Sequence, residues 1–134
     1  MTPAAEAVLE HLRAEVAVEV VDPAAPWPLI AKSVAELVSA GRCELGVVMC
    51  WTGTGSAIAA NKVPGIRAAQ ASEAWIATGA RRWNDANVLA LSSMRIAPMV
   101  AVECVSAFLS ESPDPEEAVN IALLKEMSQL EARD

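Results

Sequence analysis

The chain has 134 residues, of which 54% are hydrophobic and 20% are charged; this length and composition are typical of one folded domain and exclude a disordered chain. Its 17 acidic and 10 basic side chains give a net charge of −7, which argues against nucleic-acid binding, because that binding depends on neutralised phosphates. No apolar run approaches the roughly 20 residues that span a bilayer, and the first residues lack a signal-peptide pattern. We expect a soluble, cytoplasmic protein with one domain over residues 1–134.

Strand-like segments alternate with helical patterns along the chain. In chain order the patterns predict a helix over 3–15, a strand over 16–22, a loop over 22–28, a helix over 29–41, a strand over 44–50, a loop over 51–55, a helix over 56–62, a strand over 65–71, a helix over 72–83, a strand over 87–92, and helices over 97–110 and 114–133. Thr2, Ser72 and Asp114 stand where helix caps are expected, and Gly41 stands where a helix ends. This alternation favours an α/β fold with a mainly parallel sheet and helices on both faces.

Two segments carry further expectations. The continuous apolar run over 44–50 predicts a strand that is buried on both faces. Apolar residues cover more than half of the circumference of the last helix, namely Ile121, Ala122, Leu123, Leu124, Met127 and Leu130. Two interpretations stay open, a deeply packed terminal helix or a helix that docks on a second subunit in a dimer.

The cysteines and the histidine do not form a metal site. The chain has three cysteines, Cys43, Cys50 and Cys104, without CxxC spacing, and one histidine, His11. A zinc site needs about four clustered ligands, so we expect no metal and no cofactor. Thiols of a cytosolic protein stay reduced by default.

Residues 51–55 join a predicted strand to a predicted helix, at the edge of the sheet where α/β proteins bind ligands. Gly53 and Gly55 let the backbone approach a ligand closely, and the helix start at Ser56 presents free N–H groups. Such donors would stabilise an oxyanion on a carbonyl substrate, and the helix dipole would lower the pKa of the Cys50 thiol. Cys50 is therefore either a catalytic base or nucleophile, or a buried core cysteine.

Two stretches carry a family resemblance. Residues 58–69 read IAANKVPGIRAA and residues 84–91 read NDANVLAL; with their surroundings over 4–110 they resemble the ribose-5-phosphate isomerase B and galactose-6-phosphate isomerase family. The resemblance implies a three-layer α/β/α sandwich of Rossmann type and dimers with active sites between subunits. It also implies proton transfer between C1 and C2 of a sugar phosphate through an enediolate.

The resemblance assigns roles to particular residues. Cys50 falls on the family's cysteine base, and Asn84 falls on the asparagine that touches substrate. Thr52, Gly53 and Gly55 fall on the loop that binds the oxyanion.

The sequence departs from the family where the family binds phosphate. The family's first strand, with its Asp-His pair, has no counterpart here, and the C-terminal arginine cluster is missing. Met94 takes the place of a phosphate-binding arginine, with Arg95 one residue along, and Trp83 takes the place of the ring-opening histidine. We expect Arg67 and Arg81 to form structural salt bridges. His11 lies inside a helix, where we expect it to be partly or fully solvated.

The family resemblance places four tryptophans near one cleft, namely Trp27, Trp51, Trp75 and Trp83. They either fill core space or line an apolar pocket.

Three functions follow from these observations. The favoured one is an isomerase-like enzyme in which Cys50 moves a proton α to a carbonyl of a substrate more apolar than a pentose phosphate, by isomerisation or enol-driven cyclisation. The second is an aldose–ketose sugar-phosphate isomerase subunit completed by a partner chain, as in the two-subunit galactose-6-phosphate isomerases. The third is a non-catalytic ligand-binding subunit.

Overall fold

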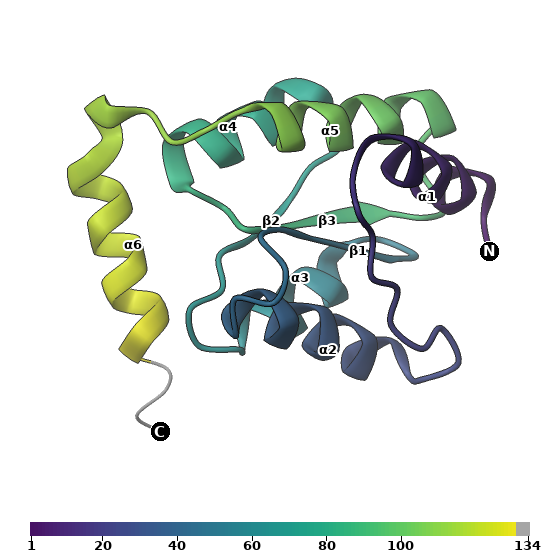
Figure 1. Cartoon of the computed structure of the whole chain (residues 1–134), viewed down its shortest axis with the longest axis horizontal. Helices are drawn as coiled ribbons and strands as arrows, with labels where there is room; N and C mark the ends of the chain where they lie inside the picture. The colour runs from purple at the N-terminus through teal and green to yellow at the C-terminus, as the bar shows by residue number, and fades with distance from the viewer. Residues whose placement is uncertain (131–134) are drawn as a thin grey trace.

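Three short strands form the middle layer of the fold (Figure 1). In the computed structural model, which describes residues 1–130, β1 (Gly46–Cys50), β2 (Ala68–Gln70) and β3 (Val88–Ser92) form one parallel sheet in the order β1-β3-β2. Val88 pairs with both Gly46 and Ala68, so β3 is the central strand. The predicted parallel sheet is confirmed.

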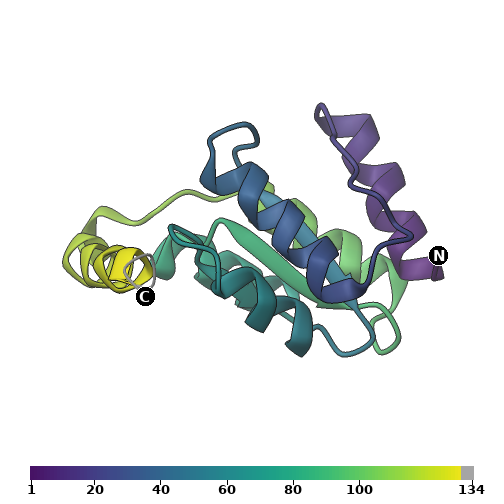
Figure 2. The ribbon, with the colours of Figure 1, turned by 90° about the horizontal axis from the view of Figure 1, so that it is seen from below.

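Helices cover both faces of this sheet (Figures 1 and 2). The first face carries α1 (Pro3–Glu15), α4 (Ala74–Asn84) and α5 (Pro98–Ser110), and the second carries α2 (Trp27–Ser39) and α3 (Thr54–Asn61). This arrangement confirms the α/β/α architecture. Among the described residues no helix is long and apolar enough to cross a membrane.

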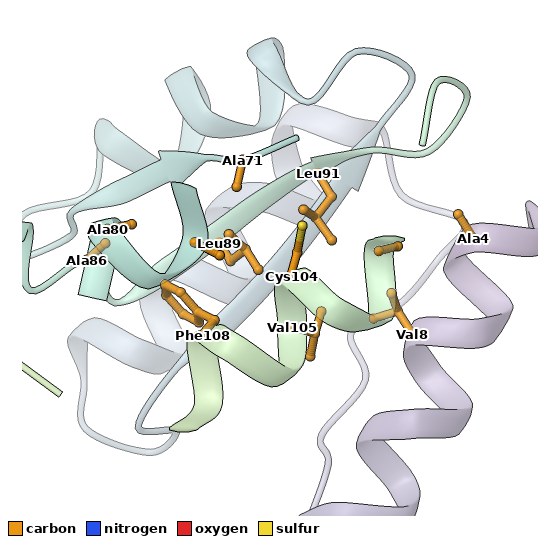
Figure 3. Packing of buried hydrophobic residues seen from close by; sticks show 12 residues of the cluster. Ala4, Val8, Ala71, Ala80, Ala86, Leu89, Leu91, Cys104, Val105 and Phe108 are labelled. Atoms are coloured by element: carbon orange, nitrogen blue, oxygen red, sulfur yellow. The ribbon is translucent and has the colours of Figure 1, made fainter. Parts of the chain in front are cut away.

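The central strand holds the two halves of the core together. Side chains of a strand alternate between the faces of a sheet, so Leu89 and Leu91 pack under α5 while Val88 and Ala90 pack against α2 and α3. Figure 3 shows the first half, in which Leu89 and Leu91 meet Cys104 and neighbouring side chains of α5. All four residues of β3 named here are 0% exposed, as its sequence predicts.

Residues 16–22, predicted as a strand, form none. Glu19 lies 3.2 Å from the guanidinium of Arg42, just before β1, and Trp27 packs on Gly55, just after β1. The segment thus contacts the chain just before β1 without pairing to that strand. Its alternating β-branched residues favour extended backbone, but a strand also needs a hydrogen-bonded neighbour, which local sequence does not supply.

The outer edge of β1 has no partner strand within residues 1–130. The N–H of Gly46 points toward β3, where it donates to the Asn87 carbonyl, so the N–H and C=O groups of Val47 and Met49 face the other way. The side chains of Val47 and Met49 are only partly buried. The prediction of a strand buried on both faces is therefore wrong at alternate positions.

The predicted helices form, but several of their ends differ: the helix predicted from residue 56 begins at Thr54, and the last helix begins at Ala118 and not at residue 114. Thr2 caps α1 by accepting the Ala5 N–H at 3.2 Å, and Gly41 follows α2 with φ +77°. Ser72 is not a cap, because α4 starts after Glu73 and no side chain caps it. Trp27 was predicted to lie in a loop but begins α2.

The C-terminal segment stands apart from the layers (Figures 1 and 2). A 3₁₀ turn, η1 (Pro115–Glu117), is capped by Asp114 and leads into α6 (Ala118–Leu130); the last residues of the predicted helix, 131–133, lie outside the described part. Ile121 is buried, whereas the other large apolar side chains described on this helix are exposed, namely Val119, Leu123, Leu124 and Met127. The interpretation of α6 as a deeply packed helix is therefore wrong.

Candidate active site

The loop after β1 places a thiol at the carboxyl edge of the sheet. β1 ends at Cys50, and the chain reverses over residues 51–53 into α3. Gly53 adopts φ +81°, and a Cβ at this position would lie 2.9 Å from the carbonyl carbon of Leu91. Only glycine fits both the backbone conformation and the space. The loop is thus pressed against the end of β3.

Neighbouring strand ends hold the backbone of this loop. The side-chain amide of Gln70, at the end of β2, donates to the carbonyl of Thr52 at 2.8 Å. The hydroxyl of Ser92 donates to the carbonyl of Trp51, and the N–H of Ser93 donates to that of Cys50 at 2.7 Å. Sequence reasoning missed these supports, although Gln70 and Ser92 both stand where a predicted strand ends.

The environment of Cys50 favours its thiolate. Burial raises the pKa of this thiol, but hydrogen bonds from the Ser56 hydroxyl and from the N–H groups of Ser56, Gly53 and Thr52 outweigh it, so the pKa lies below its ordinary value. The N–H of Gly53 lies 3.2 Å from the sulfur. Cys50 is only partly buried, so the buried-core interpretation does not hold for it.

Cys104 provides the contrast. It is 0% exposed in the core, and burial, followed by the charges of Glu103 and Glu73, raises its pKa to about 11. This thiol is a packing residue, so of these two cysteines only Cys50 has a nucleophile's environment.

Donors for a developing negative charge lie beside the thiol. The first N–H groups of a helix lack intrahelical partners, and the N–H of Gly55 is one of these in α3. The exposed hydroxyls of Thr52 and Thr54 lie 2.7 Å apart. Thr54 was not predicted, whereas Thr52, Gly53, Gly55 and Ser56 lie together with Cys50 as predicted.

The four tryptophans form two separate groups. Trp27 packs its ring on Gly55, leaving no room there for a Cβ, and Trp51, next to Cys50, is 76% exposed. Trp75 and Trp83 instead form an edge-to-face pair on α4, with ring centroids 5.7 Å apart. Trp27 therefore contacts the thiol loop from α2, on the opposite side of the sheet from α4, and Trp51 is part of the loop itself.

Asn84 lies at the other end of the sheet from Cys50. It ends α4, shortly before β3 begins at Val88, and lines a surface cavity of about 470 Å³. Residues of β2 and α6 contribute to the same cavity, among them Ala68, Leu124 and Met127. A five-residue strand is roughly 13 Å long, so one copy of the chain does not bring Asn84 to the thiol.

The arginines that sequence analysis assigned to structure are structural. The carboxylate of Asp85 lies 3.0 Å from Arg81 and 3.5 Å from Arg67, and both cations are largely buried. Arg95 follows β3, and its N–H donates to the hydroxyl of Ser92, which places the exposed Arg95 near the thiol loop. Across residues 1–130 no cluster of three metal-ligand side chains occurs.

Comparison with known proteins gives consistent matches. The family model described as ribose/galactose isomerase matches residues 2–122. The D-erythrulose-4-phosphate isomerase of Pectobacterium atrosepticum is 41% identical over 83 residues, which are 62% of this chain and 55% of that protein. The ribose-5-phosphate isomerase B of Listeria innocua is 36% identical over 104 residues, which are 77% of this chain and 70% of that protein.

A solved structure matches the fold. The type B ribose 5-phosphate isomerase of Trypanosoma brucei superposes with a TM-score of 0.85 at 31% identity, covering 91% of this chain and 88% of that one. The sequence match to the erythrulose-phosphate isomerase spans just over half of that relative's length.

Proposed function

The chain belongs to the ribose/galactose isomerase family, and from this premise we propose that it is an isomerase in which Cys50 moves a proton from the carbon beside a carbonyl to the carbonyl carbon. The observation that carries the proposal is the thiol at the end of β1, with a lowered pKa and with the Gly53 N–H 3.2 Å from its sulfur. A general base works best when its pKa lies near the working pH.

Cys50, Thr52 and Gly55 each have a part in the proposed reaction. The Cys50 thiolate removes a proton from the carbon next to the carbonyl, and the electron pair of that C–H bond forms the double bond of an enediolate. The N–H of Gly55 and the hydroxyl of Thr52 hold the resulting oxyanion. The hydroxyl proton of the neighbouring carbon moves to the former carbonyl oxygen, and the thiol returns the first proton to the former carbonyl carbon, so a new carbonyl forms on the neighbouring carbon and the reaction consumes no co-reactant and needs no cofactor.

The substrate is proposed to be more apolar than a pentose phosphate. Trp27 packs on the loop and Trp51 is exposed within it, and indole rings supply large apolar contact area. Arg67 and Arg81 are bound to Asp85, which leaves Arg95 as the cation placed near the loop by its contact with Ser92. A phosphate dianion is usually met by several charged donors.

A second candidate is a sugar-phosphate isomerase whose site is completed by another copy or a related chain. The position of Asn84 and Trp83, at the opposite end of the sheet from Cys50, supports it. In this arrangement the exposed apolar residues of α6 would form part of the dimer contact. We place the protein in the cytoplasm, where thiols such as the three free cysteines stay reduced.

Proton transfer is tested directly by exchange with solvent. The purified chain is incubated in D₂O with D-ribose 5-phosphate, D-erythrulose 4-phosphate or their unphosphorylated sugars, and NMR follows deuterium at the carbon beside the carbonyl. We expect incorporation that falls at least 100-fold in Cys50→Ala, since the base is lost, and stays unchanged in Cys43→Ala.

The outcome also separates the candidates. Turnover of ribose 5-phosphate by the chain alone would overturn the apolar-substrate proposal. Activity that appears only after addition of a related subunit would favour the second candidate. Ligand binding without exchange on any of these compounds would favour a non-catalytic binding subunit.

A further inference from the structure

Three consecutive carbonyls at the end of β1 are held by hydrogen bonds from other strands. The carbonyls of Cys50 and Trp51 accept from residues at the end of β3, the strand next to β1. The carbonyl of Thr52 instead accepts from the side-chain amide of Gln70 at 2.8 Å. Gln70 belongs to β2, which lies on the far side of β3, so its side chain reaches beyond the central strand to the loop.

The alternation of side chains along β2 explains why Gln70 meets this loop. Ala68 packs with the half of the core under α2 and α3, and Ala69 with the other half, so Gln70 is on the face that carries α3. Asn61, at the end of α3, exchanges two hydrogen bonds with the backbone of Ala68, at 2.8 and 3.0 Å. Amide side chains thus tie both ends of α3, including the loop that precedes it, to β2.

One peptide unit joins the carbonyl that Gln70 holds to a donor of the thiol. The carbonyl of Thr52 and the N–H of Gly53 belong to the same planar unit, in which they point in opposite directions. This N–H lies 3.2 Å from the sulfur of Cys50. Fixing the carbonyl therefore fixes the direction of the N–H, and a donor on the carbonyl also polarises the unit and strengthens the N–H as a donor.

This unit needs an outside anchor because a glycine follows it. Gly53 adopts φ +81°, but glycine populates positive and negative φ about equally well, so its backbone also permits a rotation that turns the N–H away from the sulfur. The carbonyl of Gly53 accepts the N–H of Ala57 at 3.2 Å, which holds the start of α3 and not the unit before it. Among the described residues, the hydrogen bonds of this unit are the one from Gln70 and the one to the sulfur.

We propose that Gln70 is a positioning residue for Cys50, whose amide holds the carbonyl of Thr52 and so aims the N–H of Gly53 at the sulfur. The catalytic meaning of this role rests on the proposed function, but the two hydrogen bonds are properties of the free protein. Burial raises the pKa of Cys50, and the N–H of Gly53 is among the groups that lower it. An N–H turned away from the sulfur would leave the thiolate with one donor fewer, and the pKa of Cys50 would rise.

The test measures the thiol without any substrate. Gln70→Met keeps a flexible, unbranched side chain of similar length and removes the donor, whereas Gln70→Glu keeps the shape but presents an ionised carboxylate, which can only accept. The matched control is Gln129→Met, at an exposed glutamine of α6. Wild type and the three variants are alkylated with iodoacetamide between pH 5 and 10, and mass spectrometry of separate peptides gives the rate at each cysteine.

We expect the pH profile of Cys50 to move up by about half a pH unit in Gln70→Met, and further in Gln70→Glu, where a negative charge also faces the loop. At pH 7 the rate in Gln70→Met then falls about twofold, because the higher nucleophilicity of the more basic thiolate offsets about half of the lost thiolate. Cys43 is the internal control, and its rate stays unchanged. A Gln70→Met profile that coincides with wild type, or an equal shift in Gln129→Met, overturns the proposal.

The path through the peptide unit has a readout of its own. At a pH where Cys50 is ionised, the amide proton of Gly53 in ¹H–¹⁵N spectra should move upfield in Gln70→Met, because its hydrogen bond to the sulfur weakens. If the alkylation profile shifts while this proton does not, Gln70 acts on the thiol by another route and the positioning role is overturned.

Failure of the proposed function is distinguishable from failure of this inference. If no sugar is turned over but the alkylation profile and the Gly53 amide both shift, the positioning of the thiol stands and the reaction assigned to the loop is wrong. If a substrate is turned over, Gln70→Met should lower kcat and move the acidic limb of its pH profile upward, with KM nearly unchanged. Turnover with an unshifted limb and an unshifted alkylation profile overturns the positioning role alone.

Discussion

Replacing Asp85 with asparagine should destabilise the fold by removing the charge on which three cations converge. The residue follows α4 with φ +46°. Its carboxylate lies 3.0 Å from Arg81, 3.0 Å from Lys125 of α6 and 3.5 Å from Arg67. Asparagine keeps the size of the side chain and tolerates the left-handed backbone, so the variant removes charge and little else.

The expected loss in the free energy of unfolding follows from how deeply Asp85 and its two arginine partners are buried. The side chains of Arg81 and Arg67 are 10% and 16% exposed, and that of Asp85 is 17% exposed. Removing one partner of a buried ion pair costs about 3–5 kcal/mol. Arg81 keeps its bond to the Ala86 carbonyl, so we expect a loss of about 2–4 kcal/mol in the free energy of unfolding.

Urea titration followed by circular dichroism measures this loss. The matched control is Glu36→Gln, which removes a carboxylate whose partner Lys32 is 3.8 Å away with both side chains more than half exposed. Such a pair contributes under about 0.5 kcal/mol. If the two variants lose the same free energy of unfolding, the network around Asp85 is not a stabilising feature and the reasoning is refuted.

Two further predictions concern the core thiol and the sheet edge. The pKa of Cys104 rises from 9.0 to about 11 on folding. Because the unfolded chain releases this proton at lower pH than the folded one, the free energy of unfolding should fall as pH rises through that interval. In urea titrations at pH 8.5 and 10.5 Cys104→Ser should reduce this fall, and a fall as large as that of the wild type would exclude Cys104 as its source. In hydrogen exchange, the amides of Val47 and Met49 should exchange faster than those of Gly46 and Val48, which point toward β3; equal protection of all four would mean that the outer edge of β1 is covered in solution.

The spacing of apolar residues predicted most of the helices and strands, because each of these elements has a regular apolar pattern within its own sequence. β3 was found as a continuous apolar run, and its residues Val88–Leu91 are all buried. The thiol loop was predicted from a local feature as well, since Cys50, Gly53 and Gly55 are adjacent in the chain. Arg67 and Arg81 were expected to form structural salt bridges, and both do so with Asp85, a partner that the sequence did not identify.

The errors arise where the outcome depends on distant parts of the chain. Residues 16–22 have the composition of a strand but no hydrogen-bonded neighbour within residues 1–130. Asn84 was grouped with Cys50 by resemblance alone, and resemblance does not say which end of the sheet each residue occupies.

The separation of Asn84 from Cys50 limits how two copies could share a site. If Asn84 of one copy reached Cys50 of another through a two-fold axis, the reverse contact would form as well, and the pair would close with two equivalent sites. A head-to-tail contact would instead produce an open row of copies, with one thiol and one Asn84 unmatched at its two ends. Of the exposed apolar residues of α6, Leu124 and Met127 line the same cavity as Asn84, so the closed arrangement would bury them at the same contact that completes the site. A dimer that shared its sites in this way would couple catalysis to assembly, and it would cover the apolar side chains of α6 that the single chain exposes.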